Sequence, residues 1–178
     1  MIFLIDIETS GLRAHLDRIV EVAVLAVSDD LSTEHGHIVI TLAPGDLSTW
    51  DPWSIDVHSK SGLLQRCQDE GISVTEAERH LINFVSQFPR GEKRAYLGGS
   101  NFHFDRAFFR VHMPTFDELC HHGGHLDAAV LRQMLKNWRP DLPVWVPPIK
   151  THEALADIRG TLEELRFYRK IIAIKTKD

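Results

Sequence analysis

Two carboxylates near the start of the chain have the spacing of metal ligands. Asp6 and Glu8 follow an apolar run that begins at Met1. In a β-strand, side chains two residues apart point to the same face, so these carboxylates would lie side by side while Ile7 points into the core. Like charges this close repel each other unless a cation lies between them. The pair suggests a metal site; the alternative is an acidic pair that meets solvent at the strand end.

Two further acids lie where such a site would need them. Asp105 follows a short strand and is expected to open a helix, where an acid also complements the helix macrodipole. Asp157 lies beside the apolar stripe of the last expected helix. An unpaired carboxylate facing a core costs on the order of several kcal/mol, and a metal ion shared with the first two acids would be its partner.

His152 is the candidate general base. It lies five positions before Asp157, in the segment that leads into the last expected helix. It can therefore reach the acids without lying on the helix face. The pKa of histidine near neutrality suits proton transfer. A capping or surface histidine is the alternative, and the four acids in order favour the catalytic interpretation.

The elements that position these residues come in the order strands first, then mixed strands and helices, which indicates a mixed α/β sheet with helices packed on it. Strands are expected at residues 1–7, 18–28, 36–42 and 94–98. The short gaps between the first three strands predict an antiparallel meander. Loops are expected at 44–52 and 140–150. Helices are expected at residues 61–69, 74–88, 105–112 and 128–138 and from about 152 onward.

Length and composition predict one globular domain over residues 1–178. Apolar residues make up 43% and charged residues 25% of the chain, which excludes disordered and fibrous proteins. The net charge of −5 speaks against a protein that coats long nucleic acid, but not against an enzyme that contacts a few phosphates.

The cysteines and the N-terminus indicate the compartment. Cys67 and Cys120 are far apart and form no Cys-x-x-Cys pair, which favours a reducing compartment, so we expect a cytoplasmic protein. The N-terminus has an acid at position 6 and no basic segment, unlike a signal peptide. No apolar run approaches the ~18 residues that a membrane helix needs, so no membrane is expected as a partner.

The acids and the histidine together resemble the three motifs of the DEDDh 3′–5′ exonucleases, which have an RNase H-like fold. The motifs are Asp6-Ile7-Glu8-Thr9 with Gly11-Leu12, Asn101-x-x-Phe104-Asp105, and His152 with Asp157 five positions later. Within this family the chain looks most like an oligoribonuclease over nearly its whole length. The segments that carry this closer likeness are residues 17–23, 58–63, 113–114, 126–127, 138–140, 154–159 and 164–169, together with Trp53.

The resemblance implies phosphodiester hydrolysis with two metal ions. Asp6, Glu8 and Asp157 would hold one Mg²⁺ or Mn²⁺, and Asp105 would support a second ion that Asp6 also reaches. All-oxygen ligands suit such hard cations. Two ions ~3.5–4 Å apart stabilise the attacking and the leaving oxygen. His152 would accept the proton of the attacking water. The substrate would be short single-stranded RNA, with DNA as an open alternative, and the product a 5′-mononucleotide.

Four more residues match family positions near the substrate. Leu12 matches a leucine that the family inserts between the last two bases, and Trp53 matches an aromatic side chain beside them. Such stacking tolerates any base. His58 matches a further position near the substrate, and Asn101 belongs to the second motif. We expect all four to bind substrate; ordinary packing is the alternative.

The chain departs from the oligoribonuclease pattern where that group binds a terminal 5′ phosphate. Asn101 replaces a serine, Gly123 and Gly124 stand in place of a tyrosine and an arginine, and Ala129 and Val130 replace hydroxyl residues. We therefore expect no strong preference for dinucleotides. The resemblance also implies a homodimer, although the segment that crosses the family's dimer interface lacks its tyrosine here.

Two other functions stay open at this point. One is a broader single-strand exonuclease that acts on DNA as well as RNA; the other is a catalytically inactive relative that only binds nucleic acid. All five catalytic positions hold the right residue types, which favours an active enzyme. The histidine-rich run from Cys120 to His125 fits no zinc motif, and its glycines suggest a flexible turn.

Overall fold

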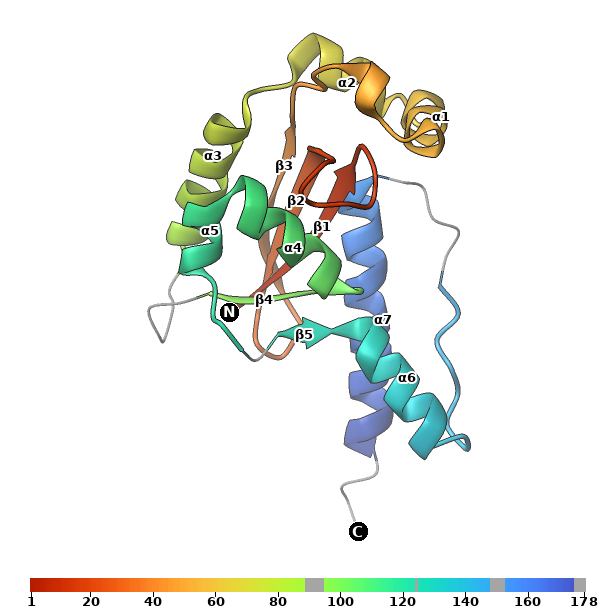
Figure 1. Cartoon of the computed structure of the whole chain (residues 1–178). Helices are drawn as coiled ribbons and strands as arrows, with labels where there is room; N and C mark the ends of the chain where they lie inside the picture. The colour runs from red at the N-terminus through yellow and green to blue at the C-terminus, as the bar shows by residue number, and fades with distance from the viewer. Residues whose placement is uncertain (89–94, 124, 148–152, 175–178) are drawn as a thin grey trace.

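A computed structural model describes residues 1–88, 95–123, 125–147 and 153–174 of the chain (Figure 1). In this part of the chain the sheet has five strands in the order β3-β2-β1-β4-β5. They are β1 (Ile2–Thr9), β2 (Ile19–Val27), β3 (Glu34–Thr41), β4 (Tyr96–Gly99) and β5 (Leu126–Asp127). The first three form the expected antiparallel meander, whereas β4 and β5 are parallel to β1. The predicted mixed sheet is confirmed.

The two strands β1 and β2 are covered on both faces. Every residue of β2 is buried, and within β1 only Asp6 and Glu8 are partly exposed. Strands buried on both faces have near-continuous apolar sequences, which explains the apolar runs at these positions. A charged side chain in such a strand needs a partner inside the protein. Asp6, Glu8 and Glu21 are the acids of these two strands.

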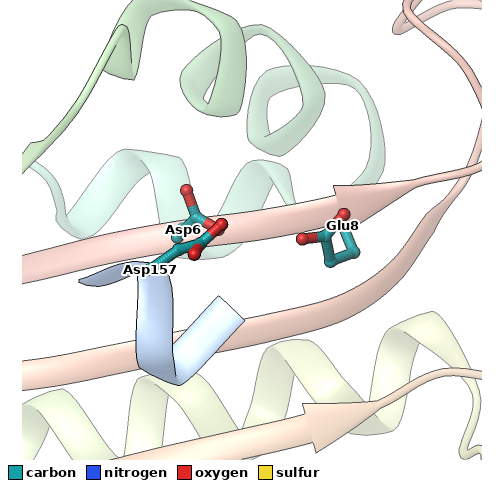
Figure 2. Close-up of side chains that lie close together, drawn as sticks. All are labelled: Asp6, Glu8 and Asp157. Atoms are coloured by element: carbon teal, nitrogen blue, oxygen red, sulfur yellow. The ribbon is translucent and has the colours of Figure 1, made fainter. Parts of the chain in front are cut away.

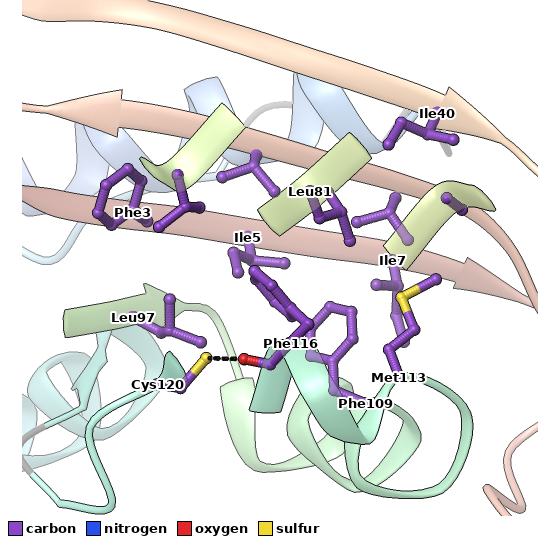
Figure 3. Close-up of a cluster of buried hydrophobic side chains, with 14 of the residues drawn as sticks. Phe3, Ile5, Ile7, Ile40, Leu81, Leu97, Phe109, Met113, Phe116 and Cys120 are labelled. Carbon is purple, nitrogen blue, oxygen red and sulfur yellow. Dashed lines mark hydrogen bonds between the residues drawn. The ribbon is translucent and has the colours of Figure 1, made fainter. Parts of the chain in front are cut away.

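Three helices cover one face of the sheet. They are α3 (Val74–Ser86), α4 (Phe102–His112) and α5 (Pro114–Leu119). Their buried side chains pack with those of Phe3 and Ile7 in one cluster, which Figure 3 shows between β1 and the helices. Since Ile7 lies in this cluster, the neighbouring acids of β1 must point to the opposite face, as the sequence predicts.

The opposite face is covered by the last helix, α7 (Ala154–Ile174), and by the start of α6 (Ala128–Trp138). Ala154, Ile158 and Leu162 form the buried stripe of α7 and pack on apolar residues of β1 and β2. Figure 1 shows α7 running alongside the sheet. The face that carries the acids of β1 is therefore the face on which α7 lies.

Two short helices lie at one end of the sheet. A short 3₁₀ turn, η1 (Leu47–Thr49), leads into α1 (Pro52–Lys60), and α2 (Leu63–Glu70) follows. Trp50 and Val20 belong to the small apolar cluster below them. Figure 1 shows α1 and α2 above the end of β1 and β2, next to the loop that joins these strands.

Two α-helices and one strand of the structure are absent from the sequence prediction. The first is α1, which starts at Pro52, at the end of the loop predicted over 44–52 and well before the helix predicted from 61. The side chain of Asp51 accepts a hydrogen bond from the Trp53 N–H. An N-terminal cap and a proline in the first turn are helix-start signals, but α1 buries only Ser54 and His58 and so lacks an apolar stripe.

The other two elements are α5 and β5. The sequence predicts only that a helix ends before Pro114; a helix does end there, and Pro114 also starts the next one, because proline fits the first turn of a helix. The strand β5 has two residues, too few for any periodic pattern.

Cys67 and Cys120 are both free and buried. No helix among the described residues is long and apolar enough to span a bilayer.

Candidate active site

Three carboxylates from the two ends of the chain meet at β1. Asp6, Glu8 and Asp157 each offer one oxygen, and these oxygens all lie within 4.8 Å of one another (Figure 2). The first two share a face of β1, and Asp157 lies in the first turn of α7, which covers that face. The structure thus brings together the three side chains that the sequence singled out. Their role as metal ligands stays a prediction.

The chemistry of this cluster suits a hard divalent cation. All three side chains are half-buried, and all offer oxygen atoms. Three carboxylates this close repel each other, and burial lowers the screening by water. Magnesium and manganese prefer carboxylate and water oxygens, whereas zinc and copper favour nitrogen and sulfur. The residues present therefore fit the metal that the sequence predicts.

Asp105 approaches the same strand from the opposite side. It is 4% exposed and accepts a hydrogen bond of 3.1 Å from the backbone N–H of Ile7. Burial, and then the charge of Asp6, raise its pKa well above the usual value. A nearby cation would favour its ionised form. The sequence predicts that Asp105 opens its helix; instead α4 starts three residues earlier, at Phe102, so Asp105 lies in the first turn.

A cavity of about 400 Å³ lies beside the acids. It is lined by all four acids and by the four residues predicted to bind substrate, Leu12, Trp53, His58 and Asn101. Leu12 is 78% and Trp53 is 60% exposed. Large apolar side chains with this exposure at a cavity are available to stack on a ligand. Their contact with substrate stays a prediction.

His58 differs from the other three because it is buried. It lies in α1, and its Nε2 is 2.9 Å from the carbonyl oxygen of Thr9. Thr9 directly follows Glu8 in β1. His58 thus fixes the end of the strand that carries the acids.

Three residues that the motifs did not name line the same cavity. They are Ser54, Ser100 and His103. His103 is exposed and lies two positions before Asp105. Its place within the second motif, close to a candidate ligand, is the signal that could have identified it.

A second, smaller cavity of about 70 Å³ adjoins the first. Asp6, Ser100 and Asp157 line both. Arg132, which also lines the smaller cavity, donates two hydrogen bonds of 2.6 Å to the buried carboxylate of Glu164. The guanidinium at this cavity is therefore already paired.

Asp127 occupies the site where two helices begin. Its carboxylate accepts hydrogen bonds from the N–H groups of Asn101 and Phe102 at the start of α4, at 3.1 and 3.0 Å. It also accepts from the N–H groups of Ala129 at 2.9 Å and Val130 at 3.4 Å, at the start of α6. These donors, which could otherwise bind an anion, are thus used within the protein.

Two sequence predictions concern residues that the structure does not describe. His152, the predicted general base, lies outside the described residues, as does Gly124. The first described residue after His152 is Glu153, whose carbonyl accepts a hydrogen bond of 3.0 Å from the Asp157 N–H.

The sequence matches a known family over most of its length. Residues 3–165 match the family described as "Exonuclease". An oligoribonuclease from Chromobacterium violaceum is 34% identical over 168 residues, which is 93% of this chain and 92% of the relative. One from Neisseria meningitidis serogroup B is 32% identical over 168 residues, which is 93% of this chain and 89% of the relative.

Solved structures of exonuclease I share the fold. The E. coli exonuclease I complex with single-stranded DNA, in its zinc-bound form, matches with a TM-score of 0.77 and 17% identity over 95% of this chain. The enzyme from Methylocaldum szegediense matches with a TM-score of 0.70 and 18% identity, also over 95% of this chain. This chain spans 40% of the length of each of those two proteins.

The fold and the family agree with each other. The five-stranded mixed sheet with its covering helices is the RNase H-like exonuclease fold that the sequence predicts. The family match includes Asp6, Glu8, Asp105 and Asp157 within residues 3–165. The chain therefore belongs to the exonuclease family, and curated oligoribonucleases are among its relatives.

Proposed function

We propose that this chain is a metal-dependent 3′–5′ exoribonuclease that degrades short single-stranded oligonucleotides to 5′-mononucleotides. The observation that carries the proposal is the meeting of Asp6, Glu8 and Asp157 beside a cavity with exposed Leu12 and Trp53. The acids supply a place for cations, and the apolar side chains supply a place for bases. Relatives that carry the name oligoribonuclease support the same interpretation.

The four acids would hold two Mg²⁺ or Mn²⁺ ions. Asp6, Glu8 and Asp157 would bind one, and Asp105, with Asp6, would bind the second. When bound, such ions activate water and stabilise the charge that develops on a transferred phosphoryl group. The raised pKa of Asp105, caused first by burial and then by Asp6, supports a cation between them because it would relieve both effects.

The other residues would orient the substrate and move protons. Leu12 and Trp53 would stack on the terminal bases of the substrate. Asn101 would face the part of the oligonucleotide that precedes these bases. Because base stacking does not depend on base identity, such a site would accept any sequence. His152 would accept the proton of the attacking water, a role that fits its position ahead of α7 in the sequence.

A broader single-strand exonuclease is the second candidate. It is favoured by the start of α6, where Ala129 and Val130 have no polar side chain and their N–H groups are bonded to Asp127. These two residues offer no group for a terminal phosphate. The E. coli exonuclease I of similar fold was solved with single-stranded DNA. An inactive binding protein is disfavoured, because all four acids lie at one cavity.

A second copy of this chain would bind along α6. Val130, Met134 and Trp138 are 54%, 40% and 68% exposed, and residues four apart are neighbours on a helix. Two copies of one apolar stripe can cover each other around a twofold axis. Light scattering would show the mass of a dimer, and Trp138→Glu would convert it to a monomer. A wild-type monomer at micromolar concentration would contradict this part of the proposal.

We also infer that residues 1–178 work as one exonuclease domain in the cytoplasm. Each of the two helical layers packs against the sheet in a buried apolar cluster, and both cysteines are free. Reduced, buried thiols suit a reducing compartment.

The test of the main proposal is a length and sugar series. RNA and DNA oligomers of about two to twenty nucleotides, labelled at the 5′ end, are incubated with Mg²⁺ or Mn²⁺ and resolved on a gel. A ladder that shortens from the 3′ end, on RNA faster than on DNA, is expected. Asp6→Asn, which keeps the side-chain shape, is the matched inactive control. Equal rates on both sugars would favour the broader exonuclease, and no products would contradict both.

A further inference from the structure

A fifth carboxylate lies next to the acid cluster. Glu21 of β2 is the direct partner of Glu8 of β1 in the antiparallel pair. Residues directly opposite each other in such a pair have side chains on the same face of the sheet. Glu21 is 2% exposed, whereas Glu8 is half-buried and faces the cavity. A buried carboxylate beside a cluster of carboxylates needs a specific reason to be there.

Both oxygens of Glu21 have partners inside the protein. Its Oε1 accepts a hydrogen bond of 2.8 Å from the guanidinium of Arg66 in α2. Its Oε2 accepts one of 3.1 Å from the backbone N–H of Ala154. Glu21 therefore connects β2 with α2 and α7. It is not one of the three side chains whose oxygens gather at the cluster.

The bond to Ala154 is a cap on α7. Ala154 is the first residue of this helix, and the first N–H groups of a helix have no acceptor within it. A carboxylate there also interacts favourably with the helix macrodipole. Since Ala154 is itself fully buried, water cannot replace this acceptor without opening the core.

The capped end of α7 is the end that carries Asp157. Asp157 follows Ala154 by three residues, about 4.5 Å along the helix axis. Asp6 and Glu8 lie on β1, which is hydrogen-bonded to the strand of Glu21. The carboxylate of Glu21 therefore bonds the start of the helix that carries Asp157 to the strand that pairs with the one carrying Asp6 and Glu8.

We propose that Glu21 is a positioning residue for the acid cluster, which holds Asp157 at Asp6 and Glu8 through the hydrogen bond to Ala154 and binds neither metal nor substrate. The inference rests on the proposed metal site. The guanidinium of Arg66 compensates the negative charge of the buried Glu21 carboxylate. The hydrogen bond of Glu21, rather than its charge, is the part that acts on the cluster.

Two conservative variants separate the hydrogen bond from the charge. Glu21→Gln keeps the length and an amide oxygen that can accept from Ala154, but loses the charge and the acceptor of the Arg66 hydrogen bond. Glu21→Asp keeps the charge, but is shorter by one methylene group and does not reach Ala154. The proposal predicts that Glu21→Gln behaves nearly like the wild type and that Glu21→Asp does not. If Glu21 acted by its charge or as a metal ligand, Glu21→Gln would be impaired more than Glu21→Asp.

Arg166→Ala is the matched control on the same helix. Arg166 bonds to the carbonyls of Leu31 and Ser32 at 2.7 and 3.1 Å and so ties α7 to the turn after β2. It lies nine residues beyond Asp157, roughly 14 Å along the axis. Its loss should destabilise the fold without moving Asp157.

The measurements are direct Mn²⁺ titration by calorimetry, kcat and KM on a seven-nucleotide RNA, and the melting temperature without metal. Glu21→Asp is expected to weaken Mn²⁺ binding about 10- to 100-fold, as loss of a group that orients a ligand typically does, and to lower kcat at fixed Mn²⁺ with KM within about twofold. Arg166→Ala is expected to lower the melting temperature and leave Mn²⁺ affinity within about twofold.

Three outcomes would overturn the inference. The first is a Glu21→Asp variant that binds Mn²⁺ as tightly as the wild type. The second is a Glu21→Gln variant that binds Mn²⁺ more weakly than Glu21→Asp. The third is an Arg166→Ala variant that loses as much Mn²⁺ affinity as Glu21→Asp. Glu21→Gln decides the matter even where Glu21→Asp does not fold, because a large loss of affinity there contradicts the proposal. A wild type that binds no Mn²⁺ and cleaves nothing would instead contradict the proposed function.

Discussion

The two walls of the site cavity differ in what they offer a nucleic acid. One wall is the loop of residues 10–17 with the start of α1, and it presents exposed Leu12 and Trp53. The other is the start of α4, which Asp127 connects to the start of α6, and the N–H donors of Asn101 and Ala129 at these two helix starts are bonded to Asp127. The first wall suits bases, whereas these donors of the second wall are not free to bind a terminal phosphate. The substrate should therefore be held mainly by its 3′-terminal bases.

The loop that carries Leu12 is fixed by its own side chains. Asp17 is buried and accepts a hydrogen bond of 2.7 Å from the Arg13 N–H. His112 of α4 lies 2.8 Å from the carbonyl oxygen of Ala14. A side chain at Gly11 would place its Cβ 2.6 Å from the Asp17 carboxyl carbon, so a larger residue there would displace the Asp17 carboxylate. A substrate contact made by Leu12 on a loop held this firmly would cost little conformational entropy.

The largest effect is expected at the acids between the two walls. Asp6→Ala or Asp157→Ala should lower kcat at least about a thousandfold while the fold stays intact, because each removes a shared cation ligand. Rates are measured on a seven-nucleotide RNA, with circular dichroism as the check on folding. More than a tenth of the wild-type rate in either variant would contradict the two-metal assignment.

The next largest effect is expected for His152. His152→Ala should lower kcat by roughly 10²–10⁴, the usual contribution of a general base, with Mn²⁺ affinity retained. Calorimetry with Mn²⁺ and kcat at saturating Mn²⁺ separate the two roles. A variant that loses Mn²⁺ affinity but keeps kcat would identify His152 as a ligand.

The first wall is tested by its exposed side chains. Trp53→Ala and Leu12→Ala should each lower kcat/KM about 5- to 150-fold, since one stacked base contributes about 1–3 kcal/mol. Leu16→Ala is the matched control, because Leu16 is 67% exposed on the same loop but lines a different cavity. A similar loss in Leu16→Ala would show that the loop acts as a whole.

The second wall is tested by substrate length. The kcat/KM of a 5′-phosphorylated two-nucleotide RNA should stay within about tenfold of that of a seven-nucleotide RNA. Charge-assisted bonds to phosphate contribute about 1.5–3 kcal/mol each, and Ala129 and Val130 have no side chain that forms one. A two-nucleotide substrate favoured a hundredfold or more would show that another group binds the phosphate, and the contrast between the walls would be wrong.

The smallest effect is a pH dependence of stability. The pKa of Asp105 is raised, by burial and then by Asp6, so its contribution to stability is lost as pH rises through the folded-state pKa. With a chelator at pH 8, Asp105→Asn should therefore melt higher than the wild type, by about 2–4 °C for each kcal/mol regained. The difference should shrink toward about pH 4, near the unfolded pKa. With saturating Mn²⁺ the wild type should melt higher than Asp105→Asn. If Asp105→Asn still melts higher, Asp105 contacts no cation.

Much of this protein could be predicted from its sequence alone. The apolar runs of β1 and β2 are typical of buried strands, and the stripe of α7 is typical of a helix that packs on them. Strand alternation by itself puts Asp6 and Glu8 on one face and Ile7 on the other. Periodic burial is a local property, so a single sequence records it.

Only the tertiary structure decided how distant segments meet. The acid within the apolar strand β2 is visible in the sequence, but nothing local shows that Glu21 reaches Ala154, 133 positions away. Likewise, Asp127 caps α6, which follows it directly, yet it also caps α4, 25 positions earlier at Phe102. Such bonds depend on the order of the strands and the packing of helices across them. These relations between elements leave no periodic signal in the chain, because each is made by a single side chain.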